Sequence, residues 1–159
     1  MSARDQFGTG HWADLVEAAP KIARAVSATV GSRREAEHEM QAFLDFVSRS
    51  EEDDGLAPLV RELAAAVRQR IEAGTDEHPE RETLVTGIES ARVAGAILAV
   101  QAAPDDAAAV CRWLLDAGTT VAAAAREGDF AGLGGRQVSV HEQEALAAIR
   151  DALTGDATP

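Results

Sequence analysis

The sequence predicts an all-α protein folded as a single helical bundle of about six helices. Apolar residues recur at spacings of three and four from position 10 to position 153, and capping residues and glycines divide this stretch into helix-length segments. No run alternates apolar and polar residues between hairpin turns. The 159 residues match one domain. We therefore expect a helical domain over residues 11–154, with flexible termini over residues 1–10 and 155–159.

The first two predicted helices meet at a glycine. The first begins near Trp12 and ends at Gly31, and we expect Pro20 to kink or restart it, because proline lacks an amide donor and clashes with the preceding turn. Ser32 and Glu35 form a capping box that begins the second helix. The apolar stripe of the second helix is Ala36, Met40, Phe43, Leu44 and Val47.

The third predicted helix has one apolar face and stops at Gly74, a residue type that favours the left-handed turn after a helix. Pro79 marks the first turn of the fourth helix. This fourth helix is apolar nearly all round, so we expect it to lie centrally in the bundle. Its small residues would let another helix approach closely: Gly87, Ala91, Ala94, Gly95 and Ala96.

The fifth predicted helix is the longest amphipathic segment. It begins at Pro104, and Asp105 and Asp106 place negative charge at the positive end of its dipole. Ser139 and Glu142 form a second capping box, which begins the last helix.

Two stretches share the pattern Val-x-Ala-Ala-Pro, at residues 16–20 and 100–104, and further matches follow at the same offset of 84 residues. The match indicates either a duplicated helical unit or the coincidence that an alanine-rich composition produces. Both explanations stay open at this point.

Charge and composition exclude several classes of function. The formal net charge of −12 repels phosphate backbones, so we expect no binding to nucleic acid.

The longest apolar run, 93–100, is far shorter than the roughly 20 residues of a membrane span, and the first ten residues contain no apolar run. Cys111 is the only cysteine, which fits a reducing compartment. We expect a cytoplasmic protein that does not associate with membranes. Cys111, Trp12 and Trp113 are interpreted as core or rim residues.

One cluster has metal-ligand spacing. Glu35, His38 and Glu39 lie at i, i+3 and i+4, and Glu-x-x-His is the spacing of di-iron carboxylate bundles. Such sites need the motif on two helices, and no other histidine follows an acid by three residues. We therefore interpret His38 as a surface histidine beside acidic neighbours, and we predict no catalytic residue and no cofactor.

A glycine-rich loop follows the fifth predicted helix. Its candidate residues, for a structural or partner-binding role, are Phe130, Gly132, Leu133, Gly134 and Gly135. A dinucleotide fingerprint would need glycine where Gln137 stands, so we interpret the glycines as turns. The two large apolar side chains either fold back onto the bundle or contact a partner, and we favour folding back.

The last third of the chain carries a resemblance. The motifs are Trp-Leu-Leu-Asp from Trp113, Glu-Gly-x-Phe before the loop, and Val-Ser at the start of the last helix. They resemble a group of uncharacterised bacterial all-helical proteins in which a long helix ends in Glu-Gly-Gly-Phe and a Val-Ser-capped helix closes the chain. Here Asp129 replaces the second glycine, and Ala131 and Leu133 stand where larger apolar residues are usual. The resemblance implies an all-helical fold and no particular activity.

These observations favour a non-enzymatic helical protein that acts through protein contacts. We expect a homo-oligomer, because small residues on several helix faces would let subunits pack closely. The alternative is a small-molecule or metal-binding bundle, possibly an enzyme, that uses carboxylates and His38. The two differ in one structural feature, which is whether Glu35, His38 and an acid from another helix point into one cleft.

Overall fold

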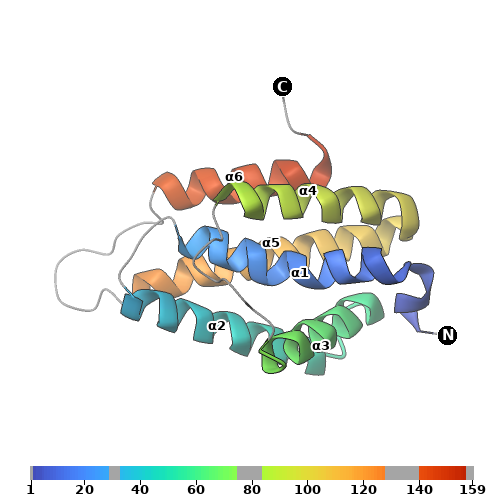
Figure 1. The fold of residues 1–159 in the computed structure, drawn as a ribbon, viewed down its shortest axis with the longest axis horizontal. Coiled ribbons are helices and arrows are strands. Elements are labelled where there is room, and N and C mark those ends of the chain that lie inside the picture. The colour runs from blue at the N-terminus through green and yellow to red at the C-terminus, as the bar shows by residue number, and fades with distance from the viewer. Residues whose placement is uncertain (1, 29–32, 75–83, 128–139, 157–159) are drawn as a thin grey trace.

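The computed structural model describes residues 2–28, 33–74, 84–127 and 140–156, and within these ranges the chain is helical with no strand, so the predicted all-α bundle is confirmed (Figure 1). The elements are a 3₁₀ helix, η1 (Ala3–Gln6), and six α-helices, α1 (Thr9–Ser27), α2 (Arg33–Glu52), α3 (Pro58–Glu72), α4 (Leu84–Gln101), α5 (Pro104–Glu127) and α6 (Val140–Thr154). The predicted boundary residues Gly31, Ser32, Pro79 and Ser139 lie outside the described ranges.

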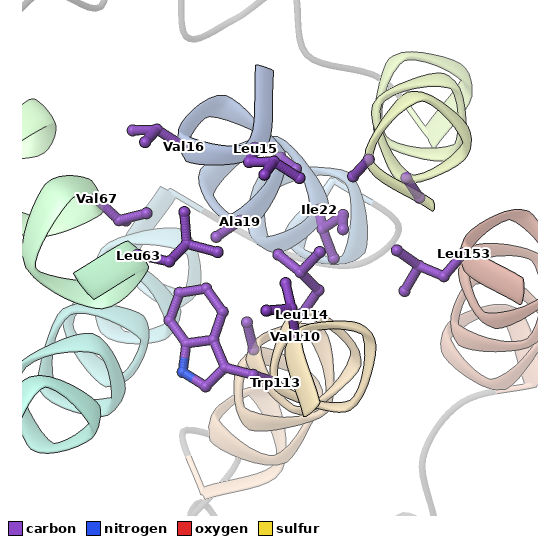
Figure 2. Close-up of a cluster of buried hydrophobic side chains, with 14 of the residues drawn as sticks. Leu15, Val16, Ala19, Ile22, Leu63, Val67, Val110, Trp113, Leu114 and Leu153 are labelled. Atoms are coloured by element: carbon purple, nitrogen blue, oxygen red, sulfur yellow. The ribbon is translucent and has the colours of Figure 1, made fainter. Parts of the chain in front are cut away.

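The centre of the bundle is the pair α1 and α5. α1 packs against α4 on one side and against α5 and α3 on the other (Figure 1). Figure 2 shows Leu15 and Ile22 of α1 and Leu114 of α5 in this core, with Leu153 of α6 pointing toward them. Pro20 lies inside α1, which is one helix from Thr9 to Ser27, so Pro20 does not divide it into two helices.

The prediction that the fourth helix lies centrally is wrong. α4 lies at the edge of the bundle and packs chiefly on α1 and α6 (Figure 1). Its inner face is buried, whereas its outer face leaves Val85 74% and Val100 82% exposed. α4 is apolar on every side because one apolar face is buried in the bundle and the other is exposed. By length and composition α4 would also suffice to cross a membrane. In this bundle 33% of the helix is buried.

Glycine lets α4 approach its two neighbours closely, as predicted. A Cβ on Gly95 would collide with the backbone carbonyl of Leu153 in α6, and a Cβ on Gly87 would collide with the Ala25 side chain in α1. Ala91 and Ala94 on the same face are fully buried, whereas Ala96 lies on the exposed face.

The N-terminal segment differs from the flexible tail expected over residues 1–10. η1 packs on α3, and the Glu62 carboxylate accepts hydrogen bonds from the backbone amides of Ala3 (3.0 Å) and Arg4 (2.9 Å) and from the Ser2 hydroxyl. Phe7 is buried against Trp12, with ring centroids 5.9 Å apart. This anchor was not predicted from the sequence because its acceptor lies about 60 residues away in the chain.

The two Val-x-Ala-Ala-Pro stretches have different structures. Pro20 lies within α1, whereas Pro104 is the first residue of α5 after the turn that follows α4. The matched residues therefore belong to one helix in the first stretch and to two helices in the second, so the match does not correspond to a repeated structural unit. The predicted end of the third helix is confirmed, because Gly74 has φ of 64° directly after α3.

Candidate binding cleft

A cleft of about 620 Å³ opens between α2, α3 and the first half of α5. Its volume lies within the range of ligand-binding pockets, roughly 300–1,000 Å³. The lining residues come from the second half of α2, the turn after it, the start of α3 and one face of α5: Phe46, Arg49, Ser50, Asp53, Gly55, Leu56, Ala57, Val60, Asp105, Asp106, Ala109, Arg112, Trp113 and Asp116.

The floor of the cleft is aromatic and held in one geometry. Trp113 is 4% exposed, and its ring stacks on half-buried Phe46 with centroids 5.8 Å apart and an interplanar angle of 23°. The Trp113 indole N–H donates to the Ser50 hydroxyl at 2.9 Å, and that hydroxyl donates to the Phe46 carbonyl at 2.8 Å. Figure 2 shows the Trp113 ring lying below Leu63, inside the core. Ser50 is therefore a positioning residue for the indole, because both of its hydrogen-bonding roles are used.

The rim of the cleft is charged, with four aspartates and two arginines, a net charge of −2. Asp105 and Asp106 lie in the first turn of α5, where the helix dipole favours carboxylates. Asp53 fixes the turn after α2 at the opposite edge of the cleft. Its carboxylate accepts a hydrogen bond from the Gly55 amide at 2.8 Å, and its backbone carbonyl accepts one from the Leu56 amide at 3.1 Å. The turn that carries Leu56 into the cleft is thus fixed by local hydrogen bonds.

Asp116 has a perturbed titration. Partial burial raises the pKa of its carboxyl above the usual value, and the nearby positive charge of Arg112 opposes this shift. A carboxylate that has lost part of its hydration gains more than a fully solvated one when a cation binds beside it. The Asp116 side of the cleft is therefore suited to a positively charged group.

An ion-pair network holds α3 in place beside the cleft. Arg68 donates to both oxygens of Glu51 in α2, at 2.6 and 3.1 Å, and to Glu72 at 2.9 Å. The hydrogen bonds from Arg68 lower the pKa of Glu51. Arg70 of α3 pairs with Glu17 of α1 at 2.5 Å. These pairs fix α3 relative to α2 and α1.

Of the metal-ligand candidates, the two with described side chains, His38 and Glu39, do not meet at one site. His38 is exposed, whereas Glu39 is buried against α1 and accepts a hydrogen bond from the Ser27 hydroxyl. The side chain of Glu35 lies outside the part of the chain that the structure describes. Within the described residues, no three His, Cys, Asp or Glu side chains gather closely enough to hold a metal ion.

Other predicted residues have mixed outcomes. Trp12 and Trp113 are buried, as expected. Cys111 is half-buried near Leu153, and burial raises the pKa of its thiol, which fits the predicted packing role. The candidate loop residues Phe130, Gly132, Leu133, Gly134 and Gly135 lie outside the described residues.

The cleft was not predicted from the sequence, although α5 carries a pattern that indicates part of it. Asp105, Ala109, Arg112 and Asp116 follow one another at spacings of four, three and four, so they form a second, polar face beside the apolar stripe. From sequence alone this face is indistinguishable from an ordinary solvated surface, because only the folded structure shows that Phe46 and Leu56 lie opposite it.

Searches against known protein families, curated proteins and solved structures find no match for this chain.

Proposed function

We propose that this protein is a non-enzymatic binding protein whose cleft receives a segment of a protein partner carrying Arg or Lys next to a large apolar side chain. The observation that carries the proposal is the combination of an aromatic floor with a net-negative rim in one cleft. Either feature alone would be an ordinary piece of surface. Together they offer two complementary subsites that lie side by side.

The two subsites have distinct chemistry. A guanidinium or ammonium group would pair with Asp105 and Asp106 at one end of the cleft or with Asp116 at the other, because the two ends lie about 16 Å apart along α5 and Arg112 stands between them. An adjacent apolar side chain would cover Leu56 and Phe46 beside the indole of Trp113, where burial of apolar surface contributes about 25 cal/mol per Å². The net charge of −12 would attract a basic segment from a distance and speed its encounter with the cleft.

The same charges argue against a nucleic acid as the partner, because the cleft presents twice as many carboxylates as arginines to a phosphate backbone. The alternative function, a metal-dependent or small-molecule bundle using carboxylates and His38, gains no support from the described residues. His38 is exposed and does not line the cleft.

A peptide selection tests the proposal. A phage-displayed library of random hexapeptides would be selected on the wild-type protein and, in parallel, on a variant with Asp105→Asn and Asp116→Asn. The control is Glu144→Gln with Asp151→Asn, because both residues are exposed on α6 away from the cleft and the pair removes the same two charges. We expect peptides with Arg or Lys beside Phe, Leu or Trp on the wild type and on the control, and loss of this enrichment on the double variant. Failure to enrich such a motif on the wild type, or equal enrichment on the double variant, would overturn the proposal.

A further inference from the structure

The outer face of α4 is apolar and uncovered. Val85 is 74%, Val93 38% and Val100 82% exposed, and Ala96 and Ala99 are exposed between and beside them. The face carries two polar interruptions, the exposed side chain of Thr86 and the ion pair between Glu89 and Arg92. An exposed apolar strip along a whole helix is typical of an interaction surface.

The residues of this face are spaced symmetrically along the helix. Val85 and Val100 lie equally far from the midpoint between Arg92 and Val93, and Glu89 and Ala96 form a second equidistant pair. A helix rises about 1.5 Å per residue, so the two outer valines lie about 22 Å apart. An antiparallel copy of α4 would therefore place Val85 against Val100 of the second copy, and Glu89 against its Ala96.

Charge complementarity strengthens this arrangement. In the antiparallel pair Glu89 of each copy lies about one helical turn from Arg92 of the other, within reach of these long side chains, so the pairs inside each helix extend into a network of two carboxylates and two guanidiniums across the interface. The small side chains of Ala96 and Ala99 would let the two helix backbones approach closely. A two-fold interface uses the same patch on both copies, and this patch is complementary to itself.

We infer that α4 is the interface of an antiparallel, two-fold symmetric homodimer of this chain. A lipid surface fits the same face less well, because Glu89 and Arg92 would place two charges in the middle of the apolar strip. Contact through one helix per copy falls below a standard interface of about 800 Å² per partner, so we expect a weak, reversible dimer.

The dimer would leave both clefts accessible. α4 lies at the opposite side of the bundle from α2 and α3, which form the cleft with α5 (Figure 1). The inference does not depend on the proposed function of the cleft, and its test uses no ligand. If both hold, the dimer presents two clefts facing away from each other, and a partner with repeated basic segments would gain from binding both.

Sedimentation equilibrium of the full chain tests the interface. We expect a reversible dimer for the wild type and at least a tenfold weaker dimer for Val100→Asp, with unchanged helicity, because Val100 is exposed in the monomer. Ala108→Asp is the control. Ala108 is exposed on α5, and its substitution adds the same negative charge away from α4. Glu89→Arg should also weaken the dimer, and the double variant Glu89→Arg with Arg92→Glu should restore it. A wild type that stays monomeric, or a dimer unaffected by Val100→Asp, would overturn the inference.

Cysteine cross-linking tests the antiparallel register in a Cys111→Ser background. Val93→Cys lies at the two-fold axis and should form a disulfide between copies under mild oxidation, whereas Val100→Cys should not, because the symmetry separates its two copies. Equal cross-linking at both positions would indicate a parallel pair and contradict the register. Co-sedimentation of the wild type with vesicles of phosphatidylcholine and phosphatidylglycerol, lost in Val100→Asp, without a dimer in solution, would instead assign the face to lipid and overturn the inference.

Discussion

The α2–α3–α5 side of the bundle and the α4–α6 side are built from different kinds of side chain. On the first side, large rings such as Phe43 and Trp113 fill the space between helices, and the Arg68–Glu51 pair links α2 to α3. On the second side, Gly87 and Gly95 bring the helix backbones together. Large side chains line the side that holds the cleft, whereas small ones bring α4 against α1 and α6 on the side whose outer face stays apolar and exposed.

The largest expected effect comes from removing a ring on the α2–α3–α5 side. Phe43 is fully buried, so Phe43→Ala should lower the free energy of unfolding by on the order of 3–5 kcal/mol in urea denaturation. Phe46→Ala is the matched control, because Phe46 is half-buried at the cleft and should cost clearly less. Equal losses for the two variants would show that this side does not depend on filled volume.

On the α4–α6 side, adding a single methyl group should be harmful. Gly95→Ala would press its Cβ into the Leu153 carbonyl and should lower the free energy of unfolding by about 1–3 kcal/mol. Gly10→Ala in α1 is the control, since nothing lies within 4 Å of its added Cβ and better helix propensity should raise stability by up to about 1 kcal/mol. A stabilising Gly95→Ala would contradict close packing of α4 on α6.

A smaller effect is expected where the N-terminal segment joins α3. Burial tends to raise the pKa of Glu62, but hydrogen bonds from Ser2, Ala3 and Arg4 outweigh it and lower the pKa. The lowered pKa means that the ionised group stabilises the fold above its ordinary pKa, and that this contribution is lost as the pH falls through the folded-state value. Glu62→Gln should therefore cost about 1 kcal/mol in urea denaturation at neutral pH. The difference in free energy of unfolding between the wild type and Glu62→Gln should shrink in acid. An unchanged difference at low pH would show that the ionised Glu62 carboxylate does not stabilise the fold.

The smallest expected effect is the pH dependence of the cleft. Burial raises the pKa of Asp116, with Arg112 opposing, so its carboxyl becomes neutral at a higher pH than an ordinary aspartate. Binding of a cationic peptide should weaken as the pH falls through that value, and Asp116→Asn should flatten this part of the profile. The raised pKa also means that ionisation of Asp116 works against folding as the pH rises, so Asp116→Asn should be neutral or slightly stabilising at neutral pH. Isothermal titration calorimetry across the acidic range measures the binding part.

The fold was predictable from sequence because it depends on local signals. Spacing of apolar residues and the residue types at Pro104 and Gly74 predicted helices that the structure contains. Placement of the helices was not predictable, since Val85 and Val100 are chemically like core valines and only the packing of α4 on α1 and α6 leaves them outside. The anchor of the N-terminal segment was likewise invisible, because Glu62 and Ser2 meet only after folding.

The cleft could be predicted only in part. The first turn of α5 was predicted to carry Asp105 and Asp106 for a helix-dipole reason, and the same carboxylates form the rim. That Phe46 and Leu56 lie opposite them depends on contacts between α2, α3 and α5, which no local pattern encodes. His38 was interpreted from the sequence as a surface histidine and is exposed, whereas Glu39, the next position on α2, is buried against α1, a difference that spacing along one helix does not encode.

The most direct test of the cleft uses the two tryptophans as internal reporters in a proton–nitrogen correlation spectrum. Trp113 forms the cleft floor with its indole N–H bonded to Ser50, whereas Trp12 lies beside Phe7 on the N-terminal side of α1. Addition of N-acetyl-Phe-Arg-amide should shift the Trp113 indole signal and leave the Trp12 signal in place, and N-acetyl-Phe-Glu-amide should shift neither. A shift of the Trp12 signal alone, or equal responses to the two peptides, would contradict a cleft that pairs an aromatic floor with a cation-binding rim.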